Sequence, residues 1–336
     1  MGNQHSPLRI EHSINKSGVL LNKRYIEILK ESNYYVQDRL LDGDAPKQFI
    51  KAYFFTPDSC VRRSRPNSWP AFIAKTAEKW YPHESVIEFM INRIGEMLGL
   101  AMNEIKLAQI NTQIRFLSKY FLTEGERLVH GAEICGEHLG DMEMADEIAK
   151  NKESARELFT FEFIKAAISA VYPETCQEIL KGLVKLIAYD ALVGNNDRHF
   201  YNWGVVDNTR KSKKMPKFAP IYDSARGLFW NYSDQNLKKV HSNYLLKGKN
   251  VQKYIDGACP RISIEDDKKA NHFTLISFIK NLDSGYKTII EELSSEENEM
   301  KVDAMLKKEF FRFFIKERCD LVKIVLQQRF ERVRNA

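Results

Sequence analysis

Short apolar runs separated by polar residues mark the chain between residues 47 and 122. The runs FIKAYFF, AFIAK and RFLSKYFL combine aromatic and branched residues over a few positions, as strands do. Between the last two, apolar residues recur at helical spacing over residues 84–98, and Gly99 follows where a helix often ends in a left-handed residue. This pattern predicts a small lobe of strands with one amphipathic helix.

Helical periodicity replaces this pattern after the polar segment TEGER, which is typical of a turn. The predicted helices are residues 154–171, residues 176–192 and several more from residue 266 to the C-terminus. We therefore place a lobe boundary at the turn, with an N-terminal lobe at 1–122 and a mostly helical C-terminal lobe at 123–336. The predicted fold class is α+β, without internal repeats.

The most informative segment is YDALVGNNDRHFYNWGVV at 189–206. An apolar helix ends there at a Gly-Asn-Asn turn, a charged loop follows, and the apolar strand WGVV begins. The loop places Asp197 and Asn202 five residues apart between two rigid elements. In phosphoryl transfer, such a carboxylate orients the attacking hydroxyl and accepts its proton, and such an amide oxygen helps to hold magnesium. Asp197 and Asn202 are therefore candidate catalytic residues.

A second apolar strand, within FAPIYDSARG at 218–227, ends in Asp223. If it pairs with WGVV across the basic turn, the resulting hairpin returns Asp223 to the side of Asn202. Carboxylate and amide oxygens are hard ligands of the kind that magnesium prefers, so these two residues are the candidate metal ligands. The D-x-x-x-x-N spacing alone is a weak signal, because Asn and Asp also form turns. The combination of elements is what makes the pattern specific.

Lys75 ends the strand AFIAK and is the candidate cationic contact to nucleotide phosphates. Glu88 lies toward the start of the following helix and is its expected partner, with Glu84, one turn earlier, as the competitor. In the candidate catalytic loop, we expect His199 to fix the loop shape through hydrogen bonds. For Arg198, a phosphate contact and a local ion pair remain equally open.

Composition narrows the class of protein. The hydrophobic and charged fractions, 43% and 29%, are those of an ordinary globular chain. The net charge of +6 is dispersed, and its densest cluster, residues 210–217, has no interleaved aromatic residues, which argues against a nucleic-acid or membrane surface. The five scattered cysteines favour reduced thiols, and no apolar run approaches the roughly 20 residues of a membrane span. These features predict a cytoplasmic protein.

The motifs GNNDRHFYN, IYDSARG and AFIAK, with the helix ESVIEFMINRIGEMLGL and the strand RFLSKYFL, resemble the HipA-like kinases over about residues 70–330. The resemblance implies a two-lobed protein-kinase-like fold and an ATP- and magnesium-dependent serine/threonine protein kinase. The nucleotide contacts that it implies are Lys75, Glu88, Tyr120, Phe121, Leu122 and Asp223. Members of the family are often bacterial toxins paired with an antitoxin. A toxin or effector role and an antitoxin-like protein partner are therefore expected, and an effector would act inside a host cell.

Two alternatives remain open. The order of Asp197, Arg198, His199 and Asn202 is also similar to the catalytic loop of phosphatidylinositol 3- and 4-kinases, which favours a lipid or small-molecule kinase. The other alternative is a nucleotide-binding pseudokinase. It is supported by the loop ahead of Lys75, which lacks glycine.

That loop, SCVRRSRPNSWP at 59–70, is the main departure from the family. Without glycine, a close backbone approach to phosphates is not evident, so we expect its side chains to cover the nucleotide. Serines of this loop can be autophosphorylated in the family, which makes Ser59, Ser64 and Ser68 candidate modification sites. The chain is also shorter at its N-terminus than full-length HipA proteins, which argues against an antitoxin contact through that region.

Overall fold

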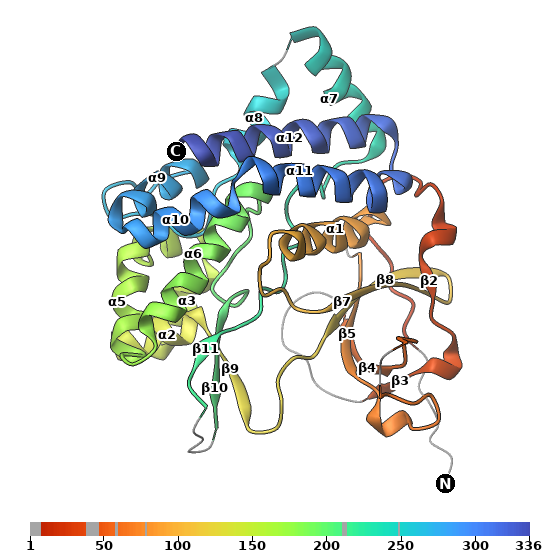
Figure 1. Ribbon diagram of the computed structural model, residues 1–336, viewed down its shortest axis with the longest axis horizontal. Coiled ribbons are helices and arrows are strands. Elements are labelled where there is room, and N and C mark those ends of the chain that lie inside the picture. Colours follow the sequence, from red (N-terminus) through yellow and green to blue (C-terminus); the bar gives the residue numbers. More distant parts are fainter. Residues whose placement is uncertain (1–7, 38–46, 58–59, 78, 210–213, 248) are drawn as a thin grey trace.

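A curled, sheet-rich lobe and a mostly helical lobe lie on either side of helix α1 (Figure 1). The structure, a computed structural model, describes every residue except 1–7, 38–46, 58–59, 78, 210–213 and 248. The combination of strands and helices confirms the predicted α+β class.

The main sheet of the smaller lobe is built from six short strands. They are β2 (Glu27–Ile28), β3 (Tyr34–Gln37), β4 (Lys47–Ala52), β5 (Ala71–Thr76), β7 (Ile105–Ile110) and β8 (Gln113–Lys119). Their order is β2-β7-β8-β5-β4-β3, and only β2 and β7 pair in parallel. Ile50, Phe72 and Leu117 form part of a small core on these strands. The predicted runs correspond to β4, β5 and β8, whereas β2 and β3 precede residue 47, where no long apolar run marks them.

Helix α1 (His83–Met97) confirms the helix predicted at 84–98. Its apolar positions Ile87, Met90 and Ile94 are completely buried, and Gly99 takes the expected left-handed conformation with a φ of 71°. The hydroxyl of Tyr189 donates a 2.6 Å hydrogen bond to the carbonyl of Ile91, which ties α1 to the helical lobe.

Two smaller sheets complete the strands. β1 (Asn15–Lys16) pairs in parallel with β6 (Trp80–Tyr81), while β9 (Glu126–His130), β10 (Gly204–Asn208) and β11 (Lys217–Phe218) form an antiparallel sheet in the order β11-β10-β9. The predicted hairpin is therefore present as β10 and β11. Its second strand ends before Ile221, which instead forms an isolated parallel bridge with Met102 of the smaller lobe. β9 was not predicted, because its first residues belong to the polar segment TEGER.

The larger lobe is helical, as predicted. Its helices are α2 (Gly131–Leu139), α3 (Met142–Lys150), α4 (Lys152–Leu158), α5 (Phe161–Val171), α6 (Cys176–Val193), α7 (Asp234–Lys247), α8 (Lys249–Gly257), α9 (His272–Leu282), α10 (Ser284–Leu293), α11 (Glu296–Met305) and α12 (Lys316–Asn335). The single helix predicted at 154–171 is wrong. Thr160 breaks it into α4 and α5, because its side chain accepts a hydrogen bond from the backbone N–H of Phe163 and so caps α5.

One large apolar core runs from α1 through the helical lobe. Ile91 of α1, Leu186 of α6 and Val325 of α12 all belong to it. The helix that carries Glu88 is thus fixed to the lobe that carries the candidate catalytic loop. In the described part of the chain, no helix is both long and apolar enough to cross a membrane.

Candidate functional site

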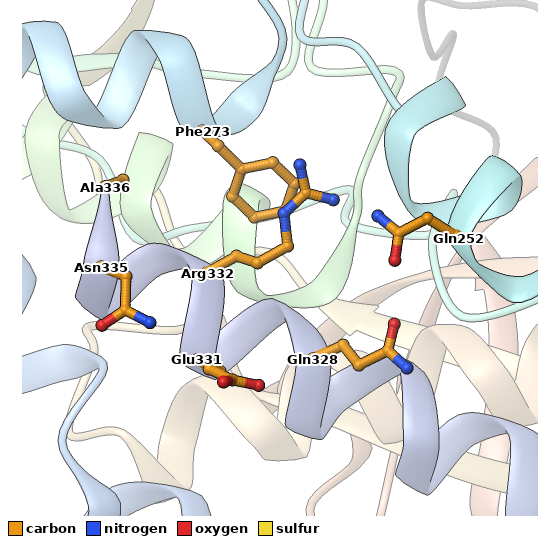
Figure 2. A pocket seen from close by; sticks show the side chains of 7 residues that line it. All are labelled: Gln252, Phe273, Gln328, Glu331, Arg332, Asn335 and Ala336. Atoms are coloured by element: carbon orange, nitrogen blue, oxygen red, sulfur yellow. The ribbon is translucent and has the colours of Figure 1, made fainter.

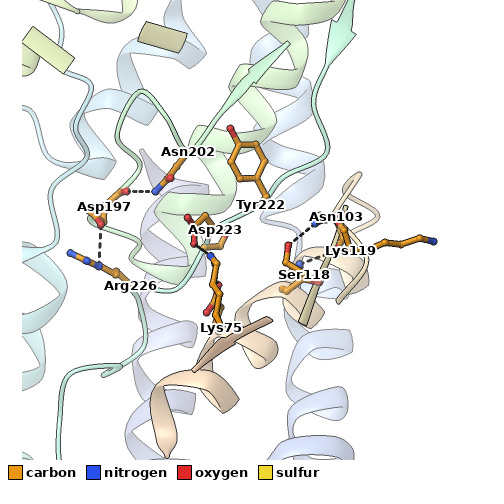
Figure 3. A network of polar contacts seen from close by, with 12 residues as sticks. Lys75, Asn103, Ser118, Lys119, Asp197, Asn202, Tyr222, Asp223 and Arg226 are labelled. Atoms are coloured by element: carbon orange, nitrogen blue, oxygen red, sulfur yellow. Dashed lines mark hydrogen bonds and ion pairs between the residues drawn. The ribbon is translucent and has the colours of Figure 1, made fainter. Parts of the chain in front are cut away.

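Lys75, Glu88 and Asp223 meet where the two lobes face each other, and Figure 3 labels Lys75 and Asp223. The Nζ atom of Lys75, near the end of β5, lies 2.5 Å from Oδ1 of Asp223 and 3.7 Å from Oε1 of Glu88. Glu84, the competing partner, instead accepts hydrogen bonds from the backbone N–H groups of Lys79 and Trp80. Glu84 thus holds the chain that enters α1, and Glu88 is the glutamate that faces Lys75.

Burial disfavours the charged forms of all three residues, and the opposite charges within the trio counteract this effect. Burial opposes the charge of Lys75, but Asp223 and Glu88 outweigh it and raise the pKa of the ammonium above its ordinary value. Burial likewise opposes the charge of Asp223, but Lys75 outweighs it and lowers the pKa of that carboxyl. For Glu88, burial prevails over the attraction of Lys75 and raises the pKa to about 7. Lys75 and Asp223 therefore form the dominant ion pair.

Asp223 adopts a backbone conformation that is rare for a residue with a side chain. Its φ is 54°, in the left-handed region that Asp and Asn populate more readily than most residues. The flanking residues are held by Arg198, which donates to the carbonyl of Tyr222 at 2.6 Å and to the hydroxyl of Ser224 at 2.7 Å. Local strain is thus compensated at the residue expected to bind the metal.

Arg198 is a structural strut, which resolves the choice between a phosphate contact and a local ion pair in favour of the pair. Its guanidinium binds both carboxylate oxygens of Asp190, at 2.8 and 2.9 Å, and the side chain is 3% exposed. The same group donates to the carbonyl of Asn202 at 2.9 Å. It therefore joins α6, the candidate catalytic loop and the Asp223 segment. Asp190 was not predicted, although a carboxylate inside the apolar run of that helix was a signal.

The residue types of Asn202 and Asp223 fit a magnesium ion. Nη1 of Arg198 lies 2.9 Å from the carbonyl oxygen of Asn202 and 3.5 Å from that of Asp223, so the two backbones are neighbours. An amide oxygen and a carboxylate are suitable magnesium ligands. His130 and Glu133, whose residue types also occur as metal ligands, form a capping box at the start of α2. In the described ranges, no group of three or more His, Cys, Asp or Glu residues is arranged to hold a metal.

Asp197 lies on the same loop, but its side chain is held by arginines. Arg226 is 3.0 Å from Oδ2, and Arg261 donates to Oδ1 at 2.8 Å. The side-chain amide of Asn202 donates to the carbonyl of Asp197 at 3.2 Å (Figure 3). His199 shapes the loop, as its Nδ1 accepts the N–H of Tyr201 and burial lowers its pKa.

Tyr120, Phe121 and Leu122 connect β8 to β9 and so join the two lobes. The N–H of Tyr120 donates to the carbonyl of Ala71, and the ring of Phe121 lies 5.9 Å from that of Tyr222. Asn103, which no motif predicted, fixes this connection. Its side chain donates to the hydroxyl of Ser118 at 2.8 Å and to the carbonyl of Lys119 at 3.0 Å (Figure 3).

The expectation that the loop at 59–70 covers the nucleotide does not fit the register of the sheet. β4 and β5 are antiparallel, with Lys51 opposite Ala71 and Lys47 opposite Lys75. The loop therefore joins the sheet at Ala71, four residues and about 13 Å of strand from Lys75. At the Lys75 end of the sheet, β3 ends at Gln37 and β4 begins at Lys47. Residues 38–46 between them, which include Gly43, lie outside the described residues.

The described part of that loop is anchored. Trp69 is buried with its ring 6.1 Å from that of Tyr35, and its indole donates to the carbonyl of Arg62. Ser64 and Ser68 are exposed, which leaves both hydroxyls at the surface. Ser59 lies outside the described residues.

A separate open pocket lies in the helical lobe, between α8, α9 and the end of α12 (Figure 2). Its lining includes Phe273 and Arg332. The guanidinium of Arg332 covers the ring of Phe273 at 3.9 Å and pairs with Asp256. Its one lining arginine is therefore already engaged, and none of the predicted site residues lines this pocket.

Comparison with known proteins places the chain. Among solved structures, the proinflammatory kinase CtkA of Helicobacter pylori is similar with a TM-score of 0.65 and 17% sequence identity, over 85% of this chain and 93% of that one. HipA of Shewanella oneidensis MR-1, solved with HipB and operator DNA, is similar with a TM-score of 0.46 and 12% identity, over 90% of this chain and 66% of that one. No curated protein matches the sequence.

The likeness to CtkA supports the two-lobed kinase fold and, at that identity, nothing beyond the fold. A family assignment comes from the sequence itself. Residues 41–298, well over half of the chain, match the family described as HipA-like C-terminal domain. The protein therefore belongs to the HipA-like family of kinases.

Proposed function

We propose that this protein is a phosphotransferase that moves the γ-phosphoryl group of ATP, with magnesium, to a serine or threonine hydroxyl of a protein. The observation that carries the proposal is the convergence of two halves of a site. Lys75 and Glu88 come from the smaller lobe, and Asp223 reaches them from the larger lobe at 2.5 Å from Lys75. The strut of Arg198 holds Asp223 beside the loop of Asp197 and Asn202.

The residues of the smaller lobe bind and orient the nucleotide. Lys75 contacts its phosphates, and Glu88 holds Lys75 in place from α1. Tyr120, Phe121 and Leu122 line the connection between the lobes, where the adenine would bind. Asn202 and Asp223 would hold magnesium, which neutralises charge on the phosphates.

The chemistry then falls to Asp197. It orients the acceptor hydroxyl and takes its proton while the hydroxyl oxygen forms a bond to the γ-phosphorus. The bond from that phosphorus to the bridging oxygen breaks, and ADP leaves with the electron pair. Proton, phosphoryl group and leaving group are thus all accounted for by one carboxylate and the nucleotide.

The contact between Lys75 and Asp223 suggests how the site prepares for the metal. Lys75 places a positive charge against the carboxylate that would otherwise bind magnesium. Nucleotide phosphates would draw Lys75 toward themselves and toward Glu88, 3.7 Å away, and would release Asp223. The close pair is therefore a resting arrangement in this proposal.

A role as a toxin or effector, with an antitoxin-like protein partner, remains part of the proposal on the strength of family membership alone. The lipid-kinase alternative rests on the loop motif and has no further support from the site geometry. The pseudokinase alternative is weakened, because the glycine-free loop at 59–70 adjoins the end of β5 that lies away from Lys75.

Incubation with labelled ATP tests the proposal. The full chain is assayed with casein, with phosphoinositide vesicles and without acceptor, each with magnesium or with EDTA. Magnesium-dependent label on serine or threonine, absent from Asp197→Asn, is the expected result. Label on lipid alone would select the alternative kinase class, and nucleotide binding without any turnover would identify a pseudokinase.

A further inference from the structure

The candidate base of the reaction shares its carboxylate with two arginines from distant segments. Arg261 follows α8 and donates through Nη2 to Oδ1 of Asp197 at 2.8 Å. Arg226 follows the Asp223 segment and places Nε 3.0 Å from Oδ2 (Figure 3). Both carboxylate oxygens of Asp197 therefore face a guanidinium. No sequence motif predicted that Arg226 and Arg261 would contact Asp197.

Positive charge exceeds negative charge around this carboxylate. Within the described residues, neither Arg226 nor Arg261 lies within ion-pair distance of another acidic side chain. Nε of Arg261 is buried and lacks a hydrogen-bond partner in the same part of the chain. The pKa of Lys152 is lowered by burial and next by the charge of Arg261, which places a third cation nearby. The carboxylate of Asp197 is thus outnumbered by the positive charges near it.

Such an arrangement is poorly explained as a support for the fold. Arg226 is 37% exposed and rests on the ring of Trp230, so water already stabilises part of its charge. The unpaired donor of Arg261 carries a cost that a second acceptor would remove. Asp197 also needs an oxygen directed at the acceptor hydroxyl during the reaction. An incoming anion that binds the arginines satisfies both requirements at once.

We propose that Arg226 and Arg261 form an acceptor-side site for a carboxylate, so that the preferred substrate is a serine or threonine within an acidic protein segment. This inference rests on the proposed function. The pair already binds one carboxylate, that of Asp197, and an aspartate or glutamate of the substrate is the same chemical group. When it binds, Asp197 is released to take the proton of the hydroxyl. Arg226 and Arg261 then determine specificity.

Matched peptides test the assignment. One peptide carries a serine flanked by glutamates, and the other carries glutamines in their place. The wild-type protein is expected to phosphorylate the glutamate peptide with the higher kcat/KM. Arg226→Gln combined with Arg261→Gln should reduce that preference by roughly tenfold to a hundredfold, mainly through KM, because charge-assisted hydrogen bonds to the substrate are lost. Arg127→Gln removes one positive charge from an exposed side chain of β9, away from the candidate site, and should keep the preference.

Several outcomes would overturn the inference. A wild-type protein that treats both peptides alike removes the site, as does a double variant that keeps the preference. If the double variant lowers kcat equally for both peptides and for hydrolysis of ATP, the arginines contact the transferred phosphoryl group instead. Transfer to phosphoinositide but to neither peptide would assign the pair to a lipid headgroup.

A binding measurement separates failure of this inference from failure of the proposed function. Fluorescence anisotropy follows a labelled glutamate peptide in which alanine replaces serine, so no turnover is needed. Binding to the wild-type protein that the double variant loses supports the carboxylate site, even if no acceptor is ever phosphorylated. Equal binding by both proteins, or none by the wild type, contradicts it.

Discussion

Two arginine–carboxylate clusters are built around adjacent residues of one loop, Asp197 and Arg198, and have opposite characters. Arg198 is 3% exposed, binds Asp190 through two hydrogen bonds and directs its other N–H groups to the carbonyls and the hydroxyl around it. Asp197, one residue earlier, divides its two oxygens between Arg226 and Arg261, and a buried N–H of Arg261 has no acceptor in the described chain. The first cluster is complete, and the second is not.

The difference separates the cluster that stabilises the loop from the cluster that we assign to substrate binding. A buried ion pair is stable only when its remaining donors and acceptors are satisfied, and the Arg198 cluster meets this condition. A partly exposed cluster with surplus charge can exchange partners at lower cost, as a substrate site requires. The first cluster should therefore respond to substitution mainly in stability, and the second mainly in activity.

Removal of the candidate base should have the largest effect. Asp197→Ala is expected to lower turnover by a factor of roughly 10² to 10⁴, the range for a lost general base, with little change in the unfolding temperature. Steady-state phosphoryl transfer and a thermal unfolding curve measure both. Asp266→Ala removes an exposed carboxylate and serves as the control. Activity close to that of the wild type would refute the role of Asp197.

A substitution in the complete cluster should lower the unfolding free energy more than a substitution in the incomplete one. Arg198→Met leaves Asp190 buried without its counterion and is expected to cost about 3–5 kcal/mol of unfolding free energy. Arg226→Met removes a partly exposed pair and should cost less than about 1 kcal/mol. Urea denaturation of the two variants compares them directly. Equal losses would show that both clusters are structural.

The metal assignment makes a prediction about nucleotide binding. Asp223→Ala removes the main carboxylate ligand, so ATP should bind with the same affinity in magnesium and in EDTA. The wild-type protein should bind more tightly with magnesium. Calorimetric titration in both buffers measures the two affinities. A variant that keeps the magnesium dependence would place the ion on other residues.

The buried trio predicts a smaller effect, in the dependence of stability on pH. Burial holds the pKa of Glu88 at about 7, above its ordinary 4.5, so the folded state keeps a proton that the unfolded state loses first. Glu88 therefore contributes stability at pH 4.5 and below that is lost as pH rises to 7. Between pH 5 and 8, the unfolding free energy of the wild type should fall relative to that of Glu88→Gln. A constant difference would contradict the raised pKa, and Glu174→Gln is the exposed control.

The smallest effect is expected at the loop between β4 and β5. Ser64 or Ser68 should carry phosphate in the active protein and none in Asp197→Ala, as mass spectrometry can establish. Ser59 remains a candidate outside the described residues. A phosphate adds about −1.5 to −2 charges beside Arg62, Arg63 and Arg65 and would pair with these arginines. Because the loop joins β5 at the end away from Lys75, activity should change little. Phosphate on the inactive variant would indicate another kinase.

Several parts of the site could be predicted because they depend on neighbours in the sequence. Helix α1 followed from its apolar spacing and Gly99, and β10 and β11 followed from two apolar runs around a basic turn. The loop that carries Asp197 and Asn202 is fixed by the end of one helix and the start of one strand. In each case, chain connectivity within about 20 residues sets the geometry.

Other features were decided only by packing between distant segments. Periodicity could not choose between Glu84 and Glu88 as the partner of Lys75, since both lie on the first turns of α1. In the folded chain, Glu84 accepts hydrogen bonds from the backbone N–H groups of Lys79 and Trp80 and is not the partner of Lys75. The loop at 59–70 precedes Lys75 in the sequence, yet antiparallel register attaches it at the far end of β5. Packing also decides β2, β3 and β9, which were missed because short strands without a long apolar run become recognisable only beside their partners.

The sequence by itself determined the family, the helical character of the larger lobe and the residue types of the candidate site, because these are encoded in local periodicity and contiguous motifs. Tertiary structure alone decided which charges meet. Arg198 became a strut and Arg226 and Arg261 became partners of Asp197 through contacts that span up to 64 residues. Burial and distance set the strength of an ion pair, and neither is defined until the chain has folded.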